Sequence, residues 1–147
     1  MLLAIDIGNT NIVFGVFEGE RLVRSWRLAT RRDQTADELG IWITQFLAHQ
    51  DLTAGLVSQI VMASVVPPVS GTMVEMVTRY FGVGPLVVDG DTDTGMANRY
   101  EPPSDVGADR IVNGVAAYER FGRTNRVPVI VVDFGTATTV DAISADG

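Results

Sequence analysis

Close to its amino terminus the chain reads Leu2-Leu-Ala-Ile-Asp-Ile-Gly-Asn-Thr-Asn-Ile-Val-Phe-Gly-Val-Phe17. Two apolar runs in this stretch, residues 2–5 and 12–17, are typical of buried strands, and the polar residues between them predict a tight turn. A carboxylate at the end of a buried strand is unfavourable unless it is paired, hydrogen-bonded or beside a metal ion. The stretch therefore predicts a β-hairpin in which Asp6 needs such a partner.

The turn of this hairpin has two possible interpretations. Gly8 lets the backbone approach a ligand closely, and the three residues after it supply amide and hydroxyl groups without adding negative charge. That combination suits a phosphate group bound with Mg²⁺. Alternatively, Gly8 and its asparagine neighbours only form the turn, and Asp6 caps it locally.

A second stretch repeats the pattern: Val129-Ile-Val-Val-Asp-Phe-Gly-Thr-Ala-Thr-Thr-Val-Asp-Ala-Ile143. Three of its residues match the first stretch at a constant offset of 127 (133 − 6), namely Asp133 with Asp6, Gly135 with Gly8, and Thr136 with Asn9. A repeat of this kind indicates a duplicated domain. Two related hairpins can face each other and hold a nucleoside triphosphate, so we expect the carboxylates of Asp6 and Asp133 to face one cleft.

The length of the chain limits how many complete domains the two repeated hairpins can belong to. With 147 residues the chain is the size of one ordinary domain, which buries roughly 70% of its unfolded surface. A repeat at an offset of 127 residues does not fit inside one such domain. We therefore expect a first domain with its substrate loop in residues 1–105. Residues 106–147 should hold a linking helix and the first hairpin of an incomplete second domain.

Composition excludes several classes of function. The net charge of −7 and a pI near 4.5 argue against binding to nucleic acid. There is no cysteine, no secretory signal pattern and no apolar run long enough to span a membrane, so we expect a cytoplasmic chain without a membrane partner. His49 is the single histidine, so proton transfer should fall to a carboxylate.

Between the two hairpins the pattern predicts an α/β layered domain. A third antiparallel strand, irregular around Val23, should be followed by a helix that opens with a Thr35-to-Glu38 capping box and ends near His49. The remaining elements expected before residue 89 are a strand at 59–66, a helix at 69–81 that Gly82 caps, and a strand at 85–88.

Residues 89–106 form a long polar loop punctuated by glycine and proline, which indicates a functional or a disordered segment. Tyr100 is its one aromatic residue and either contacts a substrate or anchors the loop. From Ala108 onward the pattern predicts a helix, and Gly107 leaves the amides at its start open to an anion. Asp109 and Arg110 are either site residues there or an ordinary first-turn acid and its neutralising neighbour.

Taken together, four motifs make the chain resemble the type III pantothenate kinases, which belong to the superfamily of acetate and sugar kinases, Hsp70 and actin. The motifs are Asp6-Ile-Gly-Asn-Thr10, Ala63-Ser-Val-Val-Pro67, Gly107-Ala-Asp-Arg110 and Asp133-Phe-Gly-Thr-Ala-Thr-Thr139. The resemblance implies an actin-like ATPase fold of the ribonuclease H-like kind. It also implies phosphorylation of pantothenate to 4′-phosphopantothenate by ATP, the first step of coenzyme A biosynthesis.

The resemblance also implies roles for individual residues. Asp109 would be the catalytic proton acceptor, and Asp133 would bind a monovalent cation, K⁺ or NH₄⁺. Asp6 would hold Mg²⁺ through water. The implied ATP-binding residues are Asp6, Ile7, Gly8, Asn9, Thr10, Asn11, Ile12, Val13 and Thr136, and the implied pantothenate-binding residues are Tyr100, Gly107, Ala108, Asp109 and Arg110. The family also suggests a homodimer.

The chain departs from the family in length, because the family continues through a complete second domain. We therefore expect the 147 residues alone to be inactive, with Val129, Val131, Val140 and Ile143 left uncovered and prone to association. Two rival functions stay open: another small-molecule kinase of the superfamily, and a non-catalytic nucleotide-binding regulator. The presence of Asp109 favours an enzyme.

Overall fold

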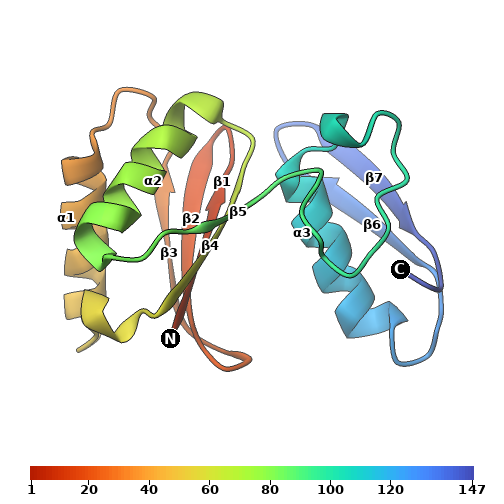
Figure 1. Cartoon of the computed structure of the whole chain (residues 1–147), viewed down its shortest axis with the longest axis horizontal. Coiled ribbons are helices and arrows are strands. Elements are labelled where there is room, and N and C mark those ends of the chain that lie inside the picture. The colour runs from red at the N-terminus through yellow and green to blue at the C-terminus, as the bar shows by residue number, and fades with distance from the viewer. The chain divides into compact units, whose positions relative to one another are not determined.

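The computed structural model describes all residues from Met1 to Gly147. They form two compact units, Met1–Val87 and Val88–Gly147 (Figure 1). The strands are β1 (Leu2–Ile7), β2 (Asn11–Glu18), β3 (Arg21–Ala29), β4 (Gln59–Ser64), β5 (Leu86–Val88), β6 (Val129–Phe134) and β7 (Thr138–Ile143). The helices are α1 (Ala36–Ala48), α2 (Pro67–Phe81) and α3 (Ala108–Ala117), with short helical turns at Ala54–Leu56, Pro103–Asp105 and Tyr118–Gly122. The domain division predicted after residue 105 stays a prediction.

The first unit is built on a five-stranded sheet with the order β3-β2-β1-β4-β5. β1 pairs antiparallel with β2 and parallel with β4, and β3 pairs antiparallel with β2. Between Val16 and Phe17 the register shifts, because their partners are Arg24 and Leu22, and this leaves Val23 unpaired. The predicted order of three antiparallel strands followed by alternating helices and strands is confirmed, including the irregularity at Val23.

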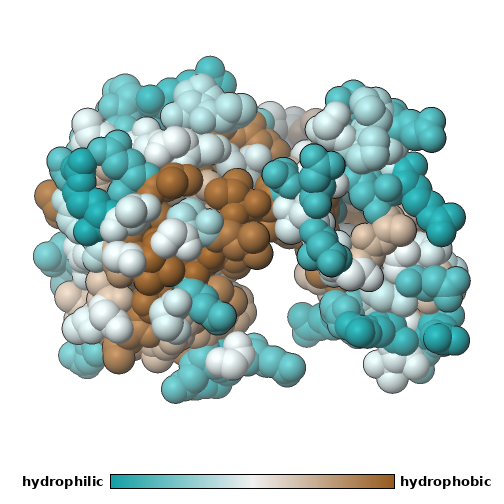
Figure 2. Space-filling model, in the orientation of Figure 1, coloured by the Kyte–Doolittle hydropathy of each residue, from teal (hydrophilic) through white to brown (hydrophobic).

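α1 and α2 lie on one face of this sheet (Figure 1). Side chains alternate across a strand, so every second residue of β1, from Leu3 to Ile7, points into the core and is fully or nearly fully buried. Phe14 and Met62 extend the same face on β2 and β4. Figure 2 shows that hydrophobic residues gather on one side of this unit in the view drawn. None of the helices combines the length and the apolar character that a membrane crossing requires.

Local signals set the ends of the helices. Thr35 and Glu38 form the predicted capping box, in which each side chain bonds to the other residue's backbone N–H. α2 starts at Pro67 rather than at residue 69, because a proline in the first helical turn gives up an N–H that has no partner there. Gly82 ends α2 with φ of 68°, the left-handed conformation that glycine adopts readily.

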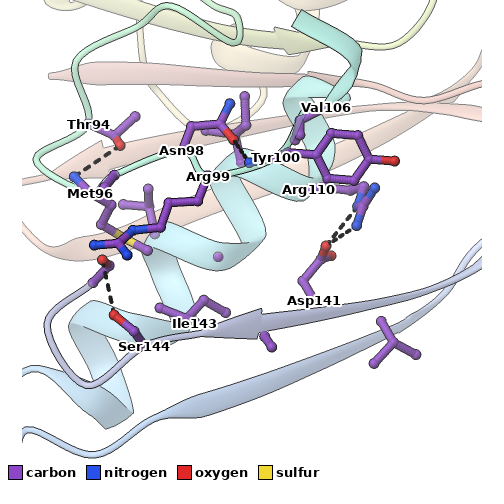
Figure 3. Close-up of a pocket in the computed structure, with 17 residues that line it drawn as sticks. Thr94, Met96, Asn98, Arg99, Tyr100, Val106, Arg110, Asp141, Ile143 and Ser144 are labelled. Atoms are coloured by element: carbon purple, nitrogen blue, oxygen red, sulfur yellow. Dashed lines mark hydrogen bonds and ion pairs between the residues drawn. The ribbon is translucent and has the colours of Figure 1, made fainter. Parts of the chain in front are cut away.

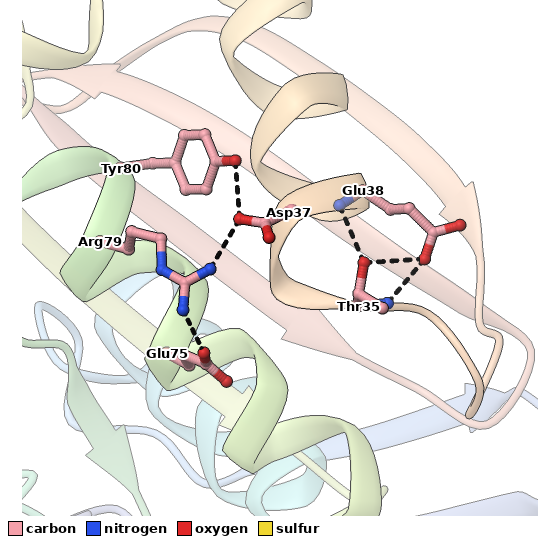
Figure 4. Close-up of polar contacts among 6 residues, drawn as sticks. All are labelled: Thr35, Asp37, Glu38, Glu75, Arg79 and Tyr80. Carbon is pink, nitrogen blue, oxygen red and sulfur yellow. Dashed lines mark hydrogen bonds and ion pairs between the residues drawn. The ribbon is translucent and has the colours of Figure 1, made fainter.

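α1 and α2 approach closely at Gly40, which makes room for the ring of Tyr80. A Cβ atom on Gly40 would lie 2.3 Å from Cε2 of Tyr80. The Tyr80 hydroxyl donates to Oδ1 of Asp37 at 2.9 Å, and Nη1 of Arg79 donates to the same oxygen at 2.7 Å (Figure 4). The polar contacts thus join the first turn of α1 to the last turn of α2.

In the second unit, α3 packs on one face of the β6–β7 hairpin and the opposite face is bare. The exposed residues of that face include Ile130 (70%), Val132 (48%), Phe134 (82%) and Val140 (62%). At the offset of 127 the β6 residues correspond to Leu3, Ile5 and Ile7, which are 0%, 3% and 0% exposed beneath the helices of the first unit. Our expectation of an uncovered face was wrong for Val129, Val131 and Ile143, which alternate onto the α3 side, and right for Val140.

Candidate functional site

The first candidate site is the turn between β1 and β2. Asp6 is exposed, whereas Ile5 and Ile7 on either side of it are buried, so its carboxylate lies on the sheet face opposite α1 and α2. The N–H of Gly8 closes the turn by donating to the carbonyl of Asn11 at 2.9 Å. The turn therefore has a fixed backbone, with polar side chains beside it.

Thr30 braces this turn from the end of β3. Its hydroxyl donates to the Gly8 carbonyl at 2.6 Å, and its N–H donates to the Thr10 carbonyl at 2.9 Å. Both carbonyls are thereby engaged in hydrogen bonds with the end of β3, which fixes the backbone of the turn. Sequence reasoning missed Thr30, since the only signal was a hydroxyl residue directly after the third strand.

The Ala63-to-Pro67 motif lies next to the same turn. β4 runs parallel to β1, and the register pairs Asp6 with Ala63 and Ile7 with Ser64. The N–H of Val65 then donates to the Ile7 carbonyl at 3.0 Å. Because the carboxyl ends of parallel strands meet at one edge of a sheet, two motifs that are far apart in the sequence share this edge.

The turn between β6 and β7 has the same design with one residue fewer. Four residues separate the paired Ile7 and Ile12, but only three separate the paired Phe134 and Thr138. The N–H of Gly135 closes this turn by donating to the Ala137 carbonyl at 3.1 Å. Thr136 is exposed at its tip.

Asp133 lies just before this turn, half-buried on the α3 side of the hairpin. Its Oδ2 atom accepts a hydrogen bond from the Asn113 side chain on α3 at 3.3 Å. Nowhere in the chain do three or more His, Cys, Asp or Glu side chains group to hold a metal ion. Asp6 and Asp133 belong to different units, so the prediction that they face one cleft stays a prediction.

A cavity of about 360 Å³ lies within the second unit, between the 94–100 segment, α3 and β7 (Figure 3). Tyr100 and Arg110 both line it, together with Asp141. Arg110 donates through Nε to Oδ1 of Asp141 at 2.8 Å and also through Nη2, while its guanidinium lies 5.3 Å from the centre of the Tyr100 ring. The structure thus brings together Tyr100 and Arg110, two of the residues predicted to bind pantothenate.

The electrostatics of the cavity are set by this group. The hydrogen bond with Asp141 is the largest cause that raises the pKa of Arg110 above its ordinary value, so Arg110 is a cation at any working pH. The side chains of Arg110 and Asp141 are only 26% and 18% exposed. The pair is therefore less screened by solvent than the other ion pairs of the chain.

The other residues predicted to bind pantothenate are not part of the cavity lining. Gly107 is the N-cap of α3, followed by Ala108 and Asp109 in the first turn. Oδ1 of Asp109 accepts a hydrogen bond from the N–H of Arg110 at 2.8 Å. The helix start is as the sequence predicted, and the role of Asp109 stays a prediction.

Comparison with known proteins bears on what these sites do. The sequence profile of the type III pantothenate kinases matches residues 2–147. The chain belongs to this family. Type III pantothenate kinases from Moorella thermoacetica and Geobacter sulfurreducens are 52% and 48% identical to the chain over all 147 residues. The chain spans 56% of the length of each of these relatives.

Solved structures support the fold expected of a type III pantothenate kinase. A putative N-acetylglucosamine kinase from Porphyromonas gingivalis matches 100% of the chain and 46% of its own length, with a TM-score of 0.52 and 12% identity. A ROK hexokinase from Thermus thermophilus matches 99% of the chain and 47% of its own length, with the same TM-score and identity. At such low identity these likenesses concern the fold alone, and they confirm the predicted actin-like class.

Two further residues of this family member escaped sequence reasoning. Asn98 holds the loop before α3: its side chain donates to the Pro103 carbonyl at 3.1 Å and accepts from the Tyr100 N–H at 3.1 Å. Asp141 holds Arg110. Asp141 could have been found from the sequence, because it is an acid at an inward-facing position of a strand, where a carboxylate requires a buried partner.

Proposed function

We propose that a protein carrying this chain transfers the γ-phosphoryl group of ATP to pantothenate and so makes 4′-phosphopantothenate for coenzyme A biosynthesis. The observation that carries the proposal is membership of the type III pantothenate kinase family across residues 2–147. Because the chain spans 56% of its relatives, the proposal concerns the whole protein.

In this proposal the two glycine-closed turns bind the ATP phosphates. Residues 6–13 contact them from the first unit and Thr136 from the second. Support comes from the fixed backbone at Gly8 and from the neutral hydroxyl and amide side chains around it, which add no charge that would repel phosphate. Phosphoryl transfer depends mainly on such positioning and on stabilising charge.

Asp6 would hold Mg²⁺ through water, and Asp133 a monovalent cation, K⁺ or NH₄⁺. The donor chemistry fits, since hard cations prefer carboxylate oxygens and Mg²⁺ in kinases needs only one or two carboxylates besides the substrate phosphates. The bound Mg²⁺ would neutralise charge on the phosphate oxygens. Asn113 bonds to Oδ2 of Asp133, which orients that carboxylate.

Asp109 would accept the proton of the pantothenate hydroxyl. The hydroxyl oxygen attacks the γ-phosphorus, the bond from that phosphorus to the β–γ bridging oxygen breaks, and ADP leaves with the electron pair. A strong base is unnecessary for this step, because the proton leaves late in a loose transition state. Support comes from the place of Asp109 in the first turn of α3, next to the cavity residue Arg110.

The cavity of the second unit would receive pantothenate. Its volume of about 360 Å³ lies within the usual range for small-ligand sites, roughly 300–1,000 Å³. Its lining combines the Tyr100 ring and the Arg110 guanidinium with apolar residues of α3 and β7. Tyr100 and Arg110 contact each other, so each restricts the other's motion.

We also propose that the whole protein is a homodimer, as the family resemblance suggests. We further propose a location in the cytoplasm, where ATP is available. Size-exclusion chromatography with light scattering would test the dimer.

The test of the proposed function is a phosphorylation assay of a protein that carries this chain with a complete second domain. ATP and Mg²⁺ are supplied with pantothenate, with pantothenol or with glucose, and ADP release is measured with and without K⁺. Phosphorylation of pantothenate that rises with K⁺ is the expected result. Preference for a sugar would indicate another kinase of the superfamily, and nucleotide binding without transfer to any acceptor would indicate a regulator.

A further inference from the structure

The cavity of the second unit contains two guanidinium groups in different situations. Arg110 already donates through Nε and Nη2 to Asp141. Arg99 lines the same cavity, and its side chain makes no hydrogen bond or ion pair. Of the two cations, Arg99 is therefore the one whose full set of donors is available to a ligand.

The two cations also lie at different ends of the cavity. Figure 3 shows the Arg110–Asp141 pair on one side of the drawn residues and the Arg99 guanidinium on the other. Arg110 directly follows Asp109, the proposed proton acceptor, in the first turn of α3. A ligand lying between them would present its reacting end to Arg110 and its far end to Arg99.

The charges favour an anion at the far end. The charged side chains that line the cavity are Arg99, Arg110 and Asp141, and together these three side chains carry one positive charge in excess. The pairing of Arg110 with Asp141 assigns that charge to Arg99. A planar guanidinium binds a carboxylate through two parallel N–H bonds, which gives orientation as well as affinity.

We infer that Arg99 is a specificity-determining residue that binds the carboxylate of the acceptor, while Arg110 and Asp141 shape the reacting end. This inference rests on the proposed function, because pantothenate carries its phosphorylated hydroxyl and its carboxylate at opposite ends. Arg99 thereby selects acceptors that end in a carboxylate over those that end in a neutral group.

The test compares two acceptors in a protein that carries this chain with a complete second domain. Pantothenate is compared with pantothenol, in which a hydroxymethyl group replaces the carboxylate. The variants are Arg99→Gln, Arg99→Lys and the control Arg126→Gln. Arg126 is an exposed arginine of the same unit that does not line the cavity, so its variant has the same change in net charge.

Arg99→Gln should raise KM for pantothenate by about tenfold or more, the range for loss of a charged hydrogen bond, and leave kcat unchanged. KM for pantothenol should not change. Arg99→Lys should recover part of the loss, and Arg126→Gln should behave as the wild type. Equal changes for both acceptors, or no change for pantothenate, would overturn the inference.

Failure of the proposed function gives a different result. If the wild type phosphorylates neither acceptor, the proposed function is wrong. Calorimetric titration of pantothenate into the wild type and Arg99→Gln then tests the contact without turnover. Weaker binding in the variant supports the contact, and equal binding or no binding by either protein refutes it.

Discussion

Asp141 accepts hydrogen bonds from both Nε and Nη2 of Arg110, which lies 31 positions earlier in the chain. This contact joins β7 to the first turn of α3 in the lining of the cavity. Removing one partner of a part-buried ion pair leaves the other charge without compensation.

Asp141→Asn should therefore destabilise the second unit by about 1–3 kcal/mol. Thermal unfolding, combined with hydrogen exchange of the α3 amides, would measure the loss. Asp146→Asn is the matched control, since Asp146 is exposed and its carboxylate makes no ion pair. Unchanged protection of α3 in Asp141→Asn would mean that the pair contributes nothing to holding the helix.

Asp109→Asn should lower turnover without disturbing the fold, because the amide is nearly isosteric and lies outside both glycine-closed turns. In a protein with a complete second domain we expect kcat to fall by about 10²- to 10⁴-fold, with ATP binding retained. Asp105→Asn, a change of the same kind in the preceding loop, should leave kcat unaltered. A near-normal kcat in Asp109→Asn would reduce Asp109 to an acid that stabilises the start of α3.

Two glycines in helices should respond to alanine in opposite directions. Gly40→Ala places a Cβ 2.3 Å from the Tyr80 ring and should destabilise the first unit by roughly 1–3 kcal/mol. Gly71→Ala in α2 meets nothing within 4 Å and should stabilise it by roughly 0.5–1 kcal/mol. Urea unfolding would measure both. Equal effects of the two substitutions would show that contact with Tyr80 does not constrain Gly40.

The start of α1 should make the first unit sensitive to acid. Hydrogen bonds from the Thr35 backbone and hydroxyl lower the pKa of Glu38, and those from Arg79 and then Tyr80 lower the pKa of Asp37. A carboxyl group with a lowered folded-state pKa stabilises the fold fully above its unfolded pKa, about 4. That contribution is lost as the pH falls through the folded value.

The free energy of unfolding should therefore decline below about pH 4, and less steeply in Glu38→Gln. Chemical unfolding at a series of pH values would follow it. Glu20→Gln, at an exposed turn position, should keep the wild-type slope. Identical slopes for wild type and Glu38→Gln would contradict the capping contribution.

The bare face of the β6–β7 hairpin should make the 147-residue chain associate. Ile130 and Val132 are 70% and 48% exposed on a two-stranded sheet with open edges. Replacing both with Thr should reduce association in sedimentation velocity, whereas Ile41→Thr on α1 should have little effect.

The chain alone should also show no ADP release that depends on pantothenate. Steady turnover by the purified chain would contradict this expectation.

Features set by neighbouring residues could be predicted from the sequence. The capping box at Thr35, the end of α2 at Gly82 and the start of α3 after Gly107 all depend on the conformational preferences of a few adjacent residues. Both hairpins followed from apolar runs on either side of a polar turn. For these elements local preference and final structure agree.

Contacts between distant residues could not be predicted in the same way. The brace from Thr30 to Gly8 spans 22 positions, and the pair of Arg110 with Asp141 spans 31. Such pairs depend on how the helices and strands pack against each other. The hydrophobic periodicity of a single segment carries no information on that packing. The same reason explains the mistaken assignment of Val129, Val131 and Ile143 to the bare face, because which side α3 covers is decided by packing.

The shorter turn between β6 and β7 also shows a position at which the repeat tolerates a change in length. Asp6 pairs with Val13 and Asp133 with Thr139, so the returning strands stand at an offset of 126 (139 − 13) rather than 127. One codon gained or lost within a strand would reverse the sides of every later side chain. In the turn a difference of one residue is accommodated, because the glycine N–H closes either length. An ungapped alignment of the two halves would wrongly match the buried Phe14 with Asp141.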